Sequence, residues 1–110
     1  MNLKELLADD QFELLSGTTT DKEIQSTRCC DLLSWVMAKG SEGMAWITVQ
    51  AHTNIVAVAS LLEFACIIIP ENIQVDKEVL DKAHDEDVAI VSTKLDAYEI
   101  FKYFYEKGLK

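Results

Sequence analysis

The sequence contains only one proline, four glycines and three cysteines in 110 residues. So little proline and glycine leaves no material for a linker, and we expect a single domain over residues 1–110. Two of the cysteines, Cys29 and Cys30, are adjacent, so the three form no disulfide framework. This usage is typical of a cytoplasmic protein with reduced thiols.

Basic residues are also scarce. Ten lysines and arginines face 19 aspartates and glutamates, which gives a net charge of −9, and Arg28 is the only arginine. Such a surface repels phosphate backbones and anionic lipids, so we expect no nucleic-acid partner and no membrane partner. A local group of backbone N–H donors can still bind a small anion on an acidic protein.

The sequence lacks the common catalytic motifs. The four glycines form neither a phosphate-binding loop nor a dinucleotide fingerprint, and no Gly-x-Ser-x-Gly elbow is present. Adjacent cysteines do not have metal-ligand spacing, and Cys66 stands inside an apolar run. We therefore expect no enzymatic activity, no catalytic residue, no metal and no cofactor.

Apolar periodicity predicts an α/β fold. A short helix with Leu3, Leu6 and Leu7, which ends near Asp9-Asp10, precedes a strand at 12–15 and a second short strand that runs through Ile24. From residue 31, helices alternate with strands; the expected strands are 44–49, 65–69 and 88–91. The last helix, 95–107, has an inner stripe of Ala97, Ile100, Phe101 and Phe104. This alternation predicts a mainly parallel sheet with helices on both faces and the N-terminal strands at an edge or in a hairpin.

Ligands bind to open parallel sheets beyond the carboxyl ends of the strands, where loops enter helix N-termini. Three polar stretches are expected to lie there and to form one anion-binding rim. Their residues are Ser26, Thr27, Arg28, Gln50, His52, Asn54, Ser92 and Thr93. Ordinary helix capping accounts equally well for Asn54 and for Thr93 with Asp96, and Asp31 is expected to cap the helix that follows it.

Two segments resemble the DRTGG domain family. They are Asp31-Leu-Leu-Ser-Trp-Val-Met37 and Ala45-Trp-Ile-Thr-Val-Gln-Ala-His-Thr-Asn-Ile-Val-Ala-Val-Ala59, and the likeness extends over essentially the whole chain. The resemblance implies a fold like the N-terminal domain of HPr kinase. It also implies a non-catalytic regulatory role, as in the domains beside CBS domains in pyrophosphatases that take part in adenine-nucleotide sensing. Ser26-Thr27 stand where the family has its glycine pair.

Two functions are therefore considered. The first is a regulatory or sensing domain that binds a small anionic ligand, with an adenine nucleotide implied by the resemblance. The alternative is a docking module that binds a partner enzyme, or a second copy of itself, without a ligand. The resemblance also implies a homodimer, and the surplus aromatic residues Tyr98, Tyr105 and Trp35 are its expected interface. Alternatively, the two tyrosines only cover the edge of the core.

Overall fold

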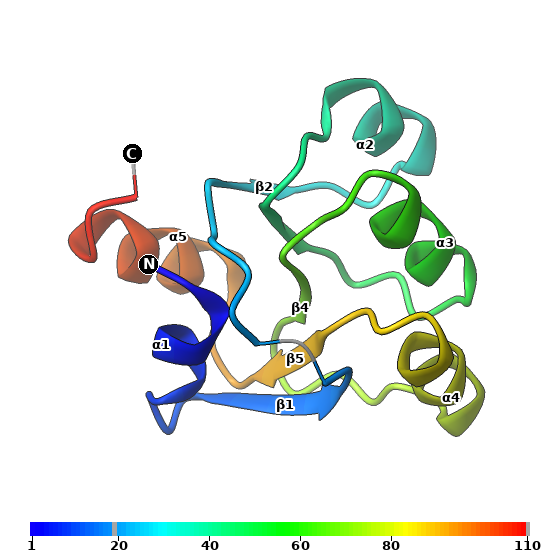
Figure 1. The fold of residues 1–110 in the computed structure, drawn as a ribbon. Coiled ribbons are helices and arrows are strands. Elements are labelled where there is room, and N and C mark those ends of the chain that lie inside the picture. Colours follow the sequence, from blue (N-terminus) through cyan, green and yellow to red (C-terminus); the bar gives the residue numbers. More distant parts are fainter. Residues whose placement is uncertain (19, 110) are drawn as a thin grey trace.

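The computed structural model describes residues 1–18 and 20–109. It places a five-stranded sheet between two layers of helices (Figure 1). The strands are β1 (Phe12–Ser16), β2 (Ser26–Cys29), β3 (Met44–Ile47), β4 (Cys66–Ile69) and β5 (Ile90–Thr93). The helices are α1 (Leu3–Leu7), α2 (Leu33–Lys39), α3 (Asn54–Leu61), α4 (Lys77–Asp85) and α5 (Ala97–Glu106).

The strand order across the sheet is β1-β5-β4-β3-β2. Strands β2 to β5 are parallel, and β1 pairs with β5 in the antiparallel direction. Right-handed crossovers that step in one direction put their helices on one face, so α2, α3 and α4 form one layer. Helices α1 and α5 cover the opposite face (Figure 1). The predicted α/β fold, with a mainly parallel sheet and helices on both faces, is confirmed.

Each face of the sheet has its own hydrophobic core. Trp46, Ile67 and Ile90 pack beneath the α2–α4 layer, whereas Ile68 and Phe104 belong to the core beneath α1 and α5. Every residue of β3 and β4 is buried. Burial on both faces explains why these strands appear in the sequence as continuous apolar runs.

The predicted second strand was wrong in position. It was expected to run through Ile24, but β2 begins at Ser26. The residues before it run beside the N-terminus, where Leu3 N–H donates to the Lys22 carbonyl and Ile24 N–H to the Met1 carbonyl, both at 2.9 Å. Strand β2 is polar because it lies at the sheet edge and is not enclosed on both faces, so it has no apolar signature.

The expected inner stripe of the last helix needs one correction. Phe101 is 38% exposed, while Ile100 and Phe104 are buried. Tyr103 contributes to the core instead, because its ring packs against Phe12 with the centroids 5.0 Å apart. The buried face of α5 is therefore turned away from Phe101 and toward Tyr103, which contacts Phe12 of β1.

Cys66 is expected to resist thiol reagents in the native protein. Its side chain is fully buried in β4, and burial raises the pKa of its thiol to about 12. A raised pKa removes the reactive thiolate at neutral pH. A colorimetric thiol assay should therefore label the exposed Cys29 first and Cys66 only in denaturant. Labelling of Cys66 at the rate of Cys29 in native buffer would contradict this assignment.

Candidate functional site

One carboxylate joins the carboxyl ends of β2 and β3. Asp31 Oδ1 accepts hydrogen bonds from Thr48 Oγ1 at 2.8 Å and from Val49 N–H at 2.9 Å. The Gln50 side-chain amide donates to the Asp31 carbonyl at 3.0 Å, and Gln50 N–H donates to Thr48 Oγ1 at 3.1 Å. Three of these bonds hold the loop after β3 against the loop after β2, and the fourth, between Gln50 and Thr48, lies within the loop after β3. We call Asp31, Thr48 and Gln50 the β2–β3 clasp.

The clasp explains why Asp31 is not the predicted helix cap. The N-cap of α2 is Leu32, and it makes no side-chain capping bond. The Asp31 carboxylate faces the adjacent strand end, where Thr48 is 1% exposed and needs a partner for its hydroxyl. A buried hydroxyl without a partner is more costly than helix N–H groups that water can solvate, so Asp31 bonds to Thr48 and does not cap α2.

Helix α3 begins beside the clasp with an open N-terminus. Thr53 precedes it without a side-chain capping bond, and its first turn, which lies wholly in the described chain, contains no acidic residue. By contrast, α1 and α5 both begin with complete capping boxes, the second formed by Asp96 and Glu99. Asn54 and Thr93 are therefore not N-caps. The Ile55 and Val56 N–H groups donate to the His52 and Thr53 carbonyls, both at 3.1 Å, so among the first three N–H groups of α3 only that of Asn54 remains available to an anion.

The structure brings three of the predicted residues together here. Gln50 belongs to the clasp, while His52 and Asn54 lie exposed on either side of Thr53. The His52 carbonyl accepts the Ile55 N–H at 3.1 Å, which fixes the turn that enters α3. The arrangement presents an imidazole and an amide at the open helix end.

Ser26-Thr27-Arg28 was predicted to be a loop. This prediction is wrong, because the three residues form most of β2. Ser26 is in register with Met44, the first residue of β3, so it lies at the opposite end of the strand from the rim. Arg28 is in register with Trp46, closer to the carboxyl end. Because β2 starts later than expected, only Arg28 of the three approaches the clasp.

Ser92 and Thr93 lie at the carboxyl end of β5, which β4 separates from β3. The loop after β4 crosses this end, where Glu71 N–H donates to the Leu95 carbonyl and Asn72 N–H to the Thr93 carbonyl. Thr93 Oγ1 accepts the Leu95 N–H at 3.2 Å. The predicted rim is thus divided into two parts, and the loop after β4 covers the part at β5.

The hollow next to Ser92 and Thr93 has a volume of about 270 Å³. Asp10 and Glu13 line it together with Lys94. Two carboxylates against one ammonium disfavour an anion here. The end of β3 is therefore the better anion site.

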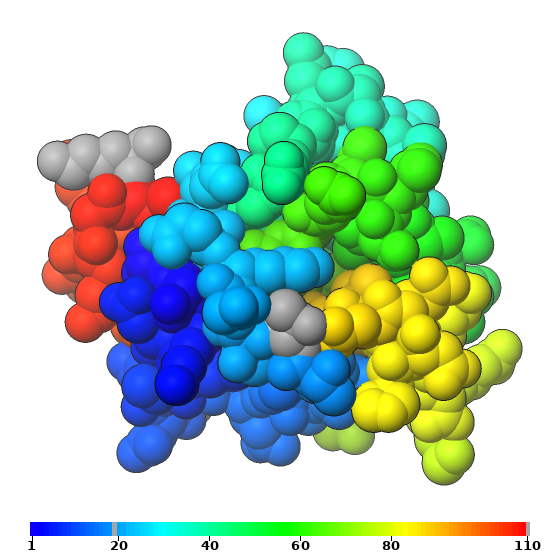
Figure 2. Space-filling view, in the orientation of Figure 1, coloured from blue at the N-terminus to red at the C-terminus, as the bar shows by residue number. Residues whose placement is uncertain are grey.

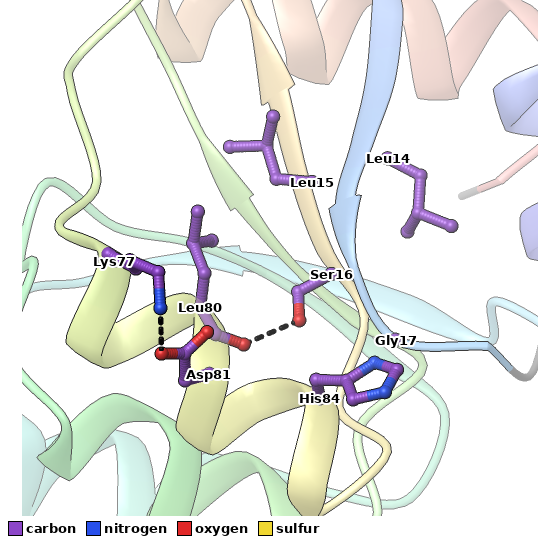
Figure 3. Close-up of a pocket in the computed structure, with 8 residues that line it drawn as sticks. All are labelled: Leu14, Leu15, Ser16, Gly17, Lys77, Leu80, Asp81 and His84. Atoms are coloured by element: carbon purple, nitrogen blue, oxygen red, sulfur yellow. Dashed lines mark hydrogen bonds and ion pairs between the residues drawn. The ribbon is translucent and has the colours of Figure 1, made fainter.

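Figure 3 shows another hollow, of about 400 Å³, between β1 and α4. Its polar groups bond to each other: Ser16 Oγ donates to the Leu80 carbonyl at 2.7 Å, and Lys77 pairs with Asp81 at 2.8 Å. The His84 ring lies exposed at its rim beside Gly17 (Figure 3). Paired groups on an open surface do not converge on a ligand, so this hollow is not the candidate site.

Sequence reasoning did not single out Thr48 and assigned Asp31 to capping. The available signal was their position in the two segments that resemble the DRTGG family, since Asp31 opens the first segment and Thr48 lies near the start of the second. Neither periodicity nor charge distinguishes them, because the bond between them joins residues far apart in the chain.

Two classes of feature are not found in residues 1–18 and 20–109. None of the helices there is long and apolar enough to cross a bilayer. No group of three or more histidine, cysteine, aspartate or glutamate side chains in these residues is arranged to hold a metal ion.

The α/β fold is similar to that of a solved structure that contains DRTGG domains, which confirms the resemblance at the level of the fold. The chain is similar to the CBS and DRTGG domains of the regulatory region of Clostridium perfringens pyrophosphatase, a structure determined with the activator diadenosine tetraphosphate. The TM-score is 0.68 at 15% sequence identity, over 91% of this chain and 44% of that chain. No family model matches the sequence, and no curated protein matches it.

Proposed function

We propose that this chain is a regulatory domain that binds a small anionic ligand, without catalysis, at the carboxyl ends of β2 and β3. The observation that carries the proposal is the open N-terminus of α3 beside the β2–β3 clasp. The clasp and the bond from Ile55 N–H to the His52 carbonyl fix the entrance to the helix, so the Asn54 N–H is oriented before a ligand arrives. The fold likeness to a regulatory region with a bound dinucleotide activator supports the same role.

An adenine nucleotide suits this site better than inorganic phosphate. The phosphate would lie at the start of α3, near His52 and Asn54. Asp31 is exposed and uses one carboxylate oxygen in the clasp, so its second oxygen is placed to accept a ribose hydroxyl. A bare phosphate gains nothing from that carboxylate and is repelled by it.

Calorimetric titration with AMP, ADP, ATP, diadenosine tetraphosphate and inorganic phosphate tests the proposal. We expect saturable binding of at least one nucleotide and weaker binding of phosphate. His52→Ala should weaken nucleotide binding by about 1.5–3 kcal/mol, the range for a hydrogen bond to a charged group. Ser92→Ala, at the end of β5, is the matched control and should leave the affinity unchanged.

Two results would contradict the proposed function. The first is the absence of heat, and of any shift in melting temperature, at millimolar concentrations of every ligand, because a ligand at 100 times its Kd stabilises a protein by about 2.7 kcal/mol. The second is an equal loss of affinity in the His52 and Ser92 variants, which would remove the site from α3.

The second candidate function is docking, and one surface favours it. Tyr98, Phe101 and Tyr105 are 77%, 38% and 62% exposed and follow one face of α5. An exposed aromatic stripe of this kind is typical of a contact surface. A partner enzyme or a second copy would fit it, and the homodimer predicted through Tyr98 and Tyr105 stays a prediction.

A further inference from the structure

The fold places a ligand crevice at the carboxyl end of β5. Helices α2, α3 and α4, which follow β2, β3 and β4, form one layer, whereas α5, which follows β5, covers the opposite face (Figure 1). In open α/β sheets, a crevice opens where the connections of two adjacent strands leave toward opposite faces. Strands β4 and β5 are such a pair. Strand β1, the other neighbour of β5, and helix α2 lie at opposite ends of the molecule (Figure 2), so this crevice is separate from the nucleotide site proposed at β2 and β3.

The loop after β4 crosses this crevice without filling it. Glu71 and Asn72 both have left-handed backbone angles, with φ values of 58° and 53°. Their N–H groups donate to the Leu95 carbonyl at 3.0 Å and to the Thr93 carbonyl at 2.9 Å, which holds the loop at the end of β5. The hollow of about 270 Å³ stays open beside it, lined by this loop, the end of β5 and the start of β1. The bonded loop therefore supplies one wall of the hollow, through Asn72.

The polar side chains around this hollow do not pair with each other. Within residues 1–18 and 20–109, the side chains of Asp10, Glu13, Asn72, Ser92 and Lys94 have no hydrogen-bond or ion-pair partner. By contrast, both lysines of α4 pair with a carboxylate one turn along the helix. Lys94 shares a hollow with two carboxylates and pairs with neither. The opposite charges therefore line separate parts of the hollow and leave its centre open to a ligand.

Glu13 and Ser92 form one side of the hollow. The two residues are opposite each other in the antiparallel pair of β1 and β5, so their side chains share one face of the sheet, with β-carbons about 4.5–5.5 Å apart. A carboxylate and a hydroxyl both accept hydrogen bonds from an ammonium group. Asp10, just before β1, adds a second negative charge, and Lys94, just after β5, supplies a positive one. The hollow thus offers two positions for cationic groups and one for an anionic group.

These charges and this volume define the class of ligand. Two carboxylates and one ammonium give the lining one net negative charge, which a ligand with two cationic groups and one carboxylate neutralises. The volume lies below the range for drug-sized ligands, so the ligand is a single small molecule. A basic α-amino acid carries these three groups on one short chain. The net charge of −9 also attracts such a cation to the protein.

We propose that this hollow binds a free basic α-amino acid. Lys94 binds its carboxylate, Asp10 and Glu13 bind its α-ammonium and its side-chain cation, and Ser92 and Asn72 complete the hydrogen bonds. The site goes beyond the proposed nucleotide site and does not depend on it, because it uses other strand ends and prefers the opposite net charge.

Amide chemical shifts during titration with L-lysine and L-arginine test the proposal. We expect saturable shifts at residues 10–13, 72 and 92–94 and none at residues 50–56, so this site and the nucleotide site are read from different amides. L-glutamate, which reverses the net charge, should shift none of them. Lysinamide, which lacks the carboxylate, should bind more weakly than L-lysine. Nα-acetyl-lysine, which represents the C-terminal lysine of a peptide and lacks the α-ammonium, should also bind more weakly.

Lys94→Met separates recognition of the carboxylate from general attraction of cations. It should weaken the binding of L-lysine by about two- to fivefold, the effect of one exposed ion pair, and should not weaken that of lysinamide. Lys4→Met removes the same charge from an exposed position on α1, away from the hollow, and should leave both affinities unchanged. Glu13→Gln should weaken both ligands. All three positions are exposed, so we expect the circular dichroism spectrum of the wild type.

Three results would overturn the proposal. The first is the absence of saturable shifts with both amino acids at millimolar concentration. The second is an affinity for Nα-acetyl-lysine, spermidine or Mg²⁺ equal to that for L-lysine, which would indicate a peptide terminus or general attraction of cations. The third is an equal loss of L-lysine and lysinamide binding in Lys94→Met.

Discussion

A Gly17→Ala variant is expected to lose about 2–5 kcal/mol of unfolding free energy, which combines backbone strain with overpacking. Gly17 has φ +97°, a region that side chains other than hydrogen rarely permit. A β-carbon there would lie 2.8 Å from Ala89 Cα and 2.9 Å from the Val88 carbonyl oxygen. Both are backbone atoms at the entrance to β5, so they cannot move aside without disturbing the sheet.

Gly108→Ala is the matched control for this prediction. Gly108 has nearly the same φ, +96°, but no described atom lies within 4 Å of the position of its β-carbon. Gly108→Ala should therefore lose only the unfolding free energy that corresponds to the strain of a left-handed residue, about 1–2 kcal/mol. Denaturant unfolding followed by circular dichroism measures both variants. Equal losses would show that the close approach of β1 to β5 contributes nothing beyond the backbone angle.

Trp46→Ala is the second change with a large expected effect, about 3–5 kcal/mol, as for other buried aromatic residues. Trp46 is fully buried in β3, and its ring packs edge-on against Phe64 with the centroids 5.8 Å apart. Its Nε1–H donates to the Cys30 carbonyl at 2.8 Å. This bond connects the core to the residue that precedes Asp31, so the variant should loosen the β2–β3 clasp as well as the core.

Trp46→Phe separates the two contributions, because it keeps an aromatic ring and removes the donor. Because the Cys30 carbonyl loses its donor, Trp46→Phe should lower the free energy of unfolding by about 1–3 kcal/mol. Trp35→Phe, at an exposed position, should stay within about 0.5 kcal/mol of the wild type. Tryptophan fluorescence identifies the residues: Trp46→Phe should leave only the red-shifted emission of Trp35. Equal stability losses in the two phenylalanine variants would contradict the assignment.

The central part of the fold was predictable because burial on both faces forces strands β3 and β4, and the first two residues of β5, to be apolar. Helix α4 was predictable for a related reason, since Val79 and Ala83 form its one buried stripe. Strand β2 gave no such signal because it lies at an edge. The helix at the C-terminus was predicted, but which of Phe101 and Tyr103 faces inward depends on Phe12 in a distant strand.

The candidate site was predictable only in part. The rule that ligands bind at strand carboxyl ends selected the loop with Gln50, His52 and Asn54, which the structure places at the open end of α3. The same rule included Ser92 and Thr93, because the sequence does not show that the loop after β4 crosses the end of β5. Local capping rules misassigned Asp31, since its partner Thr48 is distant in sequence.

Backbone amide chemical shifts during nucleotide titration test the central claim most directly, because they report the location of binding as well as its occurrence. If the ligand binds at the ends of β2 and β3, the amides of residues 50–56 should shift first, together with that of Asp31. The amides near Ser92 and Thr93 should remain unchanged. Shifts confined to the end of β5, or no shifts at millimolar nucleotide, would contradict the account.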